Sequence, residues 1–143
     1  INQRRQKVLD ISNNVNFVGE INNKQKNFLF KQTNLMVMPT VDESKKRSIE
    51  GFGISYLEAS FYGIPSIASD VGGTNEAVLH NETGLIISSI DELHIVMKDM
   101  LLNENRLKEL GTNAKKRAEK EFDWEVIVKK YIKLIKSLET SRV

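Results

Sequence analysis

The chain of 143 residues contains no cysteine, so it can form neither a disulfide framework nor a thiolate metal site. No apolar run approaches the roughly 18 residues that a membrane-spanning helix needs, and the first residues have no signal-peptide pattern. The formal net charge of +2 is too small to favour nucleic acid as a partner. With 40% apolar and 28% charged residues, the chain has the composition of one globular domain. We therefore expect a cytoplasmic protein.

Segments of strand length alternate with segments of helical period up to residue 87. We expect strands at 15–18, 35–38, 66–68 and 84–87, and helices at 24–31, 53–63 and 74–80. The run at 35–38 is wholly apolar, as in a central strand covered on both faces, and Phe28 and Leu29 are expected on the inner side of their helix. Thr74 is a candidate helix cap, and Gly63 a candidate helix end. This alternation predicts a doubly wound, Rossmann-like parallel sheet, with ligands at the carboxyl ends of the strands.

The chain is helical in pattern from residue 90 onward, with candidate helices at 90–102, 105–121 and 124–138. The last helix carries one apolar stripe at helical spacing. Its members are Trp124, Ile127, Val128, Tyr131, Leu134, Ile135 and Leu138. We favour a helix packed on its own domain with a solvated lysine face. A basic amphipathic helix lying on anionic lipid remains the alternative, which would make the protein peripheral to the inner face of a membrane.

Two glutamates, Glu50 and Glu58, bracket the expected helix start near Gly53. On a helical rise of roughly 1.5 Å per residue, their carboxylates could lie on the order of 10 Å apart. The exposed N–H groups and positive dipole end of a helix can hold a diphosphate between them. Each carboxylate can accept hydrogen bonds from the two hydroxyls of a diol, as in a ribose or a sugar. The spacing therefore predicts a sugar nucleotide as ligand.

Further motifs follow these glutamates in a fixed order. They are Gly51-Phe52-Gly53 after the first glutamate, Gly63-Ile64-Pro65 before a strand, Gly72-Gly73 with Glu76 nearby, and Thr83-Gly84-Leu85. This order resembles the donor-binding half of the retaining glycosyltransferases of family 4, which have the GT-B fold. The resemblance runs from about Asn16 to Ile87, and more loosely to Tyr131. It implies a C-terminal GT-B domain that transfers a sugar from a nucleoside-diphosphate sugar to an acceptor hydroxyl, with retention, in polysaccharide assembly.

The resemblance also implies roles for individual residues. Glu50 would bind sugar hydroxyls near the reacting carbon as the catalytic residue, and Glu58 would bind the ribose. Phe17 and Gly19 belong to a segment that would lie beside the nucleotide base. Gly72 and Gly73 either contact the donor or form a tight turn only. The diphosphate would be held by the backbone of Gly51, Phe52, Gly53 and Ile54, together with the Ser55 hydroxyl.

The chain departs from the family pattern in its first part. The basic Arg and Lys pair that grips the diphosphate in the family has no match before Asn14. The sequence starts at Ile1 rather than Met, and the opening strands and the N-terminal acceptor-binding domain are expected to be missing. We therefore expect residues 1–143 to be an N-terminally truncated part of the nucleotide-sugar-binding domain, with residues 90–143 as its helical C-terminal segment. We expect this part to be inactive alone.

The resemblance implies that neither a cofactor nor a metal ion is needed, and consistent with this, no Asp-x-Asp motif occurs to carry a metal-bound diphosphate. Three rival functions stay open. One is a non-catalytic nucleotide-sugar-binding or interaction module of the same origin. The other two are GT-B enzymes of a different kind, a sugar-nucleotide epimerase or a glycan phosphorylase. The nucleotide base, the sugar and the acceptor are not readable from these residues.

Overall fold

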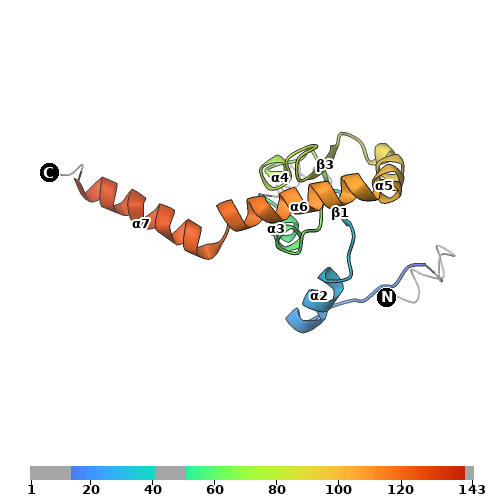
Figure 1. Ribbon diagram of the computed structural model, residues 1–143, viewed down its shortest axis with the longest axis horizontal. Coiled ribbons are helices and arrows are strands. Elements are labelled where there is room, and N and C mark those ends of the chain that lie inside the picture. The colour runs from blue at the N-terminus through green and yellow to red at the C-terminus, as the bar shows by residue number, and fades with distance from the viewer. Residues whose placement is uncertain (1–13, 41–50, 141–143) are drawn as a thin grey trace, which may run out of the picture. The chain divides into compact units, whose positions relative to one another are not determined.

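A parallel sheet of three strands forms the centre of the protein in the computed structural model, which describes residues 14–40 and 51–140 (Figure 1). The strands are β1 (Met36–Met38), β2 (Ser66–Ser69) and β3 (Gly84–Ile87), in the order β1-β2-β3. Val37 pairs with Ile67, and Ile67 pairs with Leu85. The strands predicted at 35–38, 66–68 and 84–87 are therefore confirmed.

The expectation that β1 is a central strand is wrong for the described part of the chain. β1 lies at the edge of the sheet and all three of its residues are half-buried, whereas the first three residues of β2 are buried. The physical reason is position, because an edge strand has a neighbour on one side only and its side chains are covered less completely.

Helices pack on both faces of β2. They are α3 (Ile54–Phe61), α4 (Thr74–Ala77), α5 (Leu93–Leu102) and α6 (Glu104–Glu121). Ile67 packs in one core cluster with Met100 of α5 and Leu110 of α6. The next residue, Ala68, packs in a second cluster with Tyr56 of α3 and other residues around α4. Successive strand residues point to opposite faces, so the predicted doubly wound α/β fold is confirmed.

α6 crosses α3 where two glycines meet, and Figure 1 shows the two helices side by side. A Cβ atom at Gly111 would lie 2.2 Å from the carbonyl oxygen of Gly63. Gly63 itself has φ +73, a left-handed conformation that follows the end of α3. The predicted end of this helix at Gly63 is confirmed. The close crossing requires the glycine at 111, whereas a Cβ atom at Gly63 would lie 3.7 Å from the Gly111 carbonyl oxygen, an ordinary contact.

Residues up to Gln32 form a compact unit of their own, and residues from Thr33 onward form another. In the first unit, α2 (Asn23–Phe30) begins with a capping box in which Asn22 and Gln25 exchange side chain-to-backbone hydrogen bonds of 3.0 Å. The strand predicted at 15–18 is not borne out, since the structure assigns residues 15–18 to no strand. The predicted inner side of α2 is also wrong, because Phe28 is 60% exposed and Leu29 38% exposed.

The helix predicted at 74–80 is shorter than expected. α4 ends at Ala77, because Val78 takes an extended conformation and the N–H of Leu79 donates to the Thr83 hydroxyl at 2.9 Å. Its N-cap residue is Gly73 rather than Thr74. The predicted C-terminal helices are confirmed with small changes in their ends. The first begins as a short 3-10 turn, η2 (Ile90–Glu92), and the last is α7 (Trp124–Thr140).

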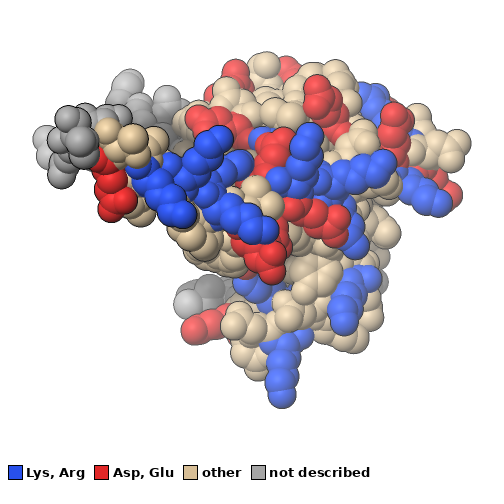
Figure 2. All heavy atoms as spheres, turned by 60° about the vertical axis from the view of Figure 1, so that its left-hand side comes forward, with Lys and Arg blue, Asp and Glu red and all other residues tan. Residues whose placement is uncertain are grey.

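The apolar stripe of α7 is exposed, so the favoured prediction that this helix packs on its own domain is wrong for the described residues. Trp124 is 80% exposed, Tyr131 65% and Leu138 57%. α7 continues from the end of α6, and Figure 2 shows basic side chains gathered along it. Its apolar side is therefore free for another surface. Across residues 14–40 and 51–140, no helix combines the length and apolarity needed to cross a bilayer.

Candidate functional site

The start of α3 is built around a glycine in a left-handed conformation. Gly53 is the N-cap residue, with φ +85, and a Cβ atom there would lie 2.4 Å from the ring of Tyr56. Both the backbone angle and the space exclude any larger residue. The eight-residue helix follows at Ile54, as predicted. Its first N–H groups have no acceptor within the helix, and the positive end of the helix dipole lies there.

Tyr56 ties this helix start to the end of β1. The tyrosine is completely buried, and its hydroxyl donates to the carbonyl oxygen of Met38 at 2.5 Å. Met38 is the last residue of β1. The start of α3 therefore lies at the carboxyl edge of the parallel sheet, where ligands bind in open α/β folds.

The loop that precedes α3 touches the loop that follows β2. A Cβ atom at Gly73 would lie 2.1 Å from the carbonyl oxygen of Gly51, so the two backbones are in direct contact. Gly72 has φ +61, which a residue with a side chain rarely adopts. The two glycine loops therefore lie at the same edge of the sheet and meet at Gly51 and Gly73.

Buried Thr74 holds the loop that contains Gly72 and Gly73 through side-chain hydrogen bonds. Thr74 is completely buried, and its hydroxyl donates to the carbonyl oxygen of Ser69 at 2.5 Å. The Thr74 hydroxyl oxygen also accepts from the N–H of Val71 at 3.4 Å. A threonine after two glycines predicted a helix cap. The structure instead uses its hydroxyl to hold the turn between β2 and Gly72.

An aromatic contact holds the first loop from the side of α6. The ring of Phe52 lies 5.7 Å from the ring of Phe122, centroid to centroid, at an interplanar angle of 54°. The Arg117 guanidinium lies over the ring of Phe122, 5.0 Å from its centroid. Nothing in the sequence pattern distinguishes Arg117 or Phe122 from their neighbours. Their contacts span long stretches of sequence and only folding brings them together.

The remaining predicted site residues stand as follows. Glu58 is the fifth residue of α3, half-buried, and shares a helix face with the exposed Ile54. Glu50 lies outside the described residues. Phe17 is half-buried and Gly19 has φ +66, both in the first unit. The roles of these residues stay predictions.

Acidic and histidine side chains do not gather elsewhere into a site in the part of the chain that the structure describes. No group of three or more His, Asp or Glu residues placed to hold a metal ion occurs among these residues. His80 is exposed, and its Nδ1 atom accepts from the N–H of Ile86 at 3.0 Å. The expectation that no metal or cofactor is needed stays a prediction.

The fold and this edge together define a class of protein. It is the α/β class with a doubly wound parallel sheet, in which a glycine-capped helix start and a second glycine loop meet at the carboxyl edge. The family model of the glycosyl transferases group 1 matches residues 3–117. The chain belongs to this family, which confirms the resemblance to the C-terminal half of GT-B glycosyltransferases.

Relatives and solved structures agree with this assignment. The chain is 25% identical over 134 residues to the GDP-mannose-dependent alpha-(1-6)-phosphatidylinositol monomannoside mannosyltransferase of Mycobacterium tuberculosis, with 92% of this chain covered. It is similar to the solved sucrose-phosphate synthase of Thermosynechococcus elongatus, with a TM-score of 0.80, 27% identity and 97% of this chain covered. HepE of Anabaena, solved in complex with UDP-glucose, shares the fold, with a TM-score of 0.76, 22% identity and 94% of this chain covered.

The chain spans about a third of the length of the proteins that it matches. It covers 35% of the mycobacterial mannosyltransferase, 34% of the sucrose-phosphate synthase and 35% of HepE.

Proposed function

We propose that this chain is the donor-binding half of a retaining glycosyltransferase that moves a sugar from a nucleoside-diphosphate sugar to an acceptor hydroxyl. One observation carries the proposal. The start of α3, capped by Gly53, meets the Gly72-Gly73 loop through the contact between Gly51 and Gly73 at the carboxyl edge. The names of the mannosyltransferase and of the UDP-glucose complex support a nucleotide sugar as the ligand.

The diphosphate would lie at the first turn of α3. The backbone N–H groups of Phe52, Gly53 and Ile54 and the hydroxyl of Ser55 supply donors there, aided by the helix dipole. In the transfer step these donors would stabilise the negative charge that develops on the leaving diphosphate. Gly51 and the Gly72-Gly73 loop would form the opposite wall, since the two loops are in backbone contact.

The two glutamates would read the two ends of the donor. Glu58 would accept hydrogen bonds from the ribose hydroxyls, and Glu50 would bind sugar hydroxyls next to the reacting carbon. Phe17 and Gly19 would lie beside the base. Retention, the family 4 type and independence of a metal ion rest on the resemblance of the Glu50-to-Leu85 string alone.

The exposed side of α7 supports a proposal about the partners of the whole enzyme. We propose that its apolar stripe packs against the acceptor-binding domain, because a contiguous apolar face is stabilised by burial. Its lysines, which are Lys129, Lys130, Lys133 and Lys136, would then remain available for peripheral contact with an anionic membrane on the cytoplasmic side. A polysaccharide or another glycan is the class of product that fits such an enzyme.

Calorimetric titration with UDP, GDP and ADP tests the donor site. We expect one nucleotide to bind the chain saturably, Glu58→Ala to abolish that binding, and Glu109→Ala, an exposed carboxylate on α6, to leave it unchanged. If the chain alone binds none, the same titration is repeated on the longer protein that contains it. Absence of binding there too, or equal binding by the Glu58→Ala variant, would overturn the respective assignment.

A further inference from the structure

We propose that Arg117 and Phe122, at the end of α6, are positioning residues that hold Phe52 and thereby set the conformation of the donor-diphosphate loop. The inference rests on the proposed function, because it assigns a task at that same site. Neither residue touches the predicted ligand positions. Both act through Phe52.

Arg117 has all the partners that a structural anchor needs. Its Nη1 and Nη2 atoms donate to the carbonyl oxygens of Ala77 and Glu76, at 3.0 and 2.7 Å, and its Nε donates to Glu121 at 3.1 Å. Its side chain is only 16% exposed. These two carbonyls lie at the end of α4, where a helix leaves acceptors unsatisfied and carries negative partial charge. The guanidinium therefore joins α6 to the helix that follows the Gly72-Gly73 loop.

Through Phe122, the same guanidinium is also connected to the loop Gly51-Phe52-Gly53. It lies over the ring of Phe122, and Phe122 packs against Phe52. Phe52 also packs against the core cluster that contains Tyr56 and Ala68. One arginine thus connects the segment after β2 with the segment before α3.

Phe52 is the one side chain in a three-residue stretch that otherwise consists of glycine. A Cβ atom at Gly51 would meet nothing within 4 Å, and Gly53 is left-handed. Glycines have more conformational freedom to lose on folding than any other residue. The packing of Phe52 is therefore the main side-chain restraint on this stretch, and the N–H groups proposed to hold the diphosphate would follow its position.

The shape of Arg117 matters as well as its charge. A planar fork can donate to two carbonyls and stack on a ring at once, whereas the ammonium group of lysine is a point donor. We therefore expect the Arg117→Lys variant to lose the positioning of Phe52, even though lysine keeps the positive charge. Phe122→Leu removes the ring from both of its contacts, and Phe122→Tyr keeps the ring.

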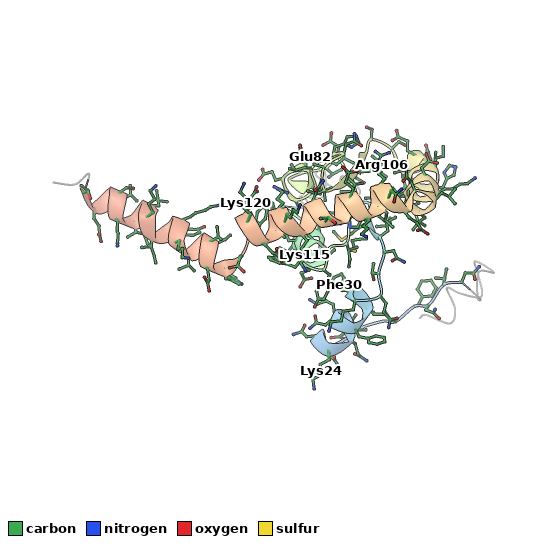
Figure 3. All side chains as sticks on the ribbon, viewed as in Figure 1. Lys24, Phe30, Glu82, Arg106, Lys115 and Lys120 are labelled. Atoms are coloured by element: carbon green, nitrogen blue, oxygen red, sulfur yellow. The ribbon has the colours of Figure 1, made fainter. Side chains whose placement is uncertain are left out.

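The experiment uses the full-length enzyme and compares four variants with the wild type. We expect Phe122→Leu and Arg117→Lys to raise the KM for the nucleotide sugar and the Kd for the nucleotide roughly tenfold, with the KM for the acceptor unchanged. Phe122→Tyr should restore wild-type values. The matched control is Arg106→Lys on the same helix (Figure 3), where Arg106 contacts the side chain of Asn81 and no residue of the donor edge.

Thermal unfolding of each variant separates positioning from stability. A lower melting temperature with an unchanged donor KM would overturn the inference, as would a rise in the acceptor KM of the same size. If Phe122→Leu gives no folded protein, the comparison of Arg117→Lys with Arg106→Lys decides alone. Failure of the wild-type enzyme to bind any nucleotide is a different result, because it would overturn the proposed function itself.

Discussion

The Tyr56 hydroxyl and the Met38 carbonyl oxygen lie 2.5 Å apart, and this bond joins the first turn of α3 to the end of β1. Through it, the helix that begins at Ile54 is held at the sheet edge where β1 ends. The site is therefore built on the sheet and not on the loops alone.

Replacing Tyr56 by phenylalanine tests that bond. Tyr56→Phe keeps the ring but leaves the part-buried Met38 carbonyl without this donor, which should lower the free energy of unfolding by about 1–2 kcal/mol. Urea unfolding of the two proteins measures the difference. The control is Tyr131→Phe on α7, where the side chain is 65% exposed and the loss should be negligible. Equal effects of the two substitutions would contradict the role given to Tyr56.

A methyl group at Gly73 should separate the two loops. Gly73→Ala places its Cβ against the Gly51 carbonyl, which is backbone and has to shift. We expect a loss of roughly 1–3 kcal/mol in stability together with weaker nucleotide binding. Gly51→Ala provides the steric comparison, because its Cβ meets nothing within 4 Å. Its melting temperature should stay near that of the wild type. A drop as large as that of Gly73→Ala would show that the clash is not the cause.

Removing the Thr74 hydroxyl should loosen the turn after β2. Thr74→Val is close in shape and removes the hydroxyl that bonds the carbonyl oxygens of Ser69 and Val71, while the bond of 3.0 Å from the Val71 N–H to the Ser69 carbonyl remains. The expected loss is about 1–3 kcal/mol, measured by thermal unfolding. Thr112→Val on α6 removes an exposed hydroxyl and should cost no more than about 0.5 kcal/mol. The prediction fails if the buried and exposed positions respond alike.

Alanine at Gly111 should change stability in the direction opposite to helix propensity. Within a helix, glycine to alanine ordinarily stabilises by up to about 1 kcal/mol. Here the added Cβ would lie 2.2 Å from the Gly63 carbonyl, so α6 and α3 have to move apart and the protein should be destabilised. Thr112→Ala, the neighbouring exposed position, serves as the control and should be neutral or slightly stabilising. A stabilised Gly111→Ala protein would disprove the close crossing.

Much of the fold could be predicted from local patterns. Periodicity and the positions of glycines, which act over a few residues, predict several elements. These are the strands at 66–69 and 84–87, the start of α3 after Gly53, its end at Gly63 and the long C-terminal helices. The strand expected at 15–18 is not found in the structure, because an apolar bias over four residues is a weak signal that does not by itself distinguish a strand from irregular structure. Thr74 was predicted to cap a helix, but Gly73 is the N-cap residue and the Thr74 hydroxyl bonds the loop after β2.

The class of fold, the order of the motifs and their agreement with a glycosyltransferase donor half could be read from the chain alone, because these depend on residues close together in it. What holds the motifs in place became visible only in the folded protein. The Gly51–Gly73 contact, the Phe52–Phe122 pair and the arginine over it join residues far apart in sequence. The tertiary structure also decided that the stripe of α7 is exposed, because an apolar face shows that a helix will be covered and does not show by what.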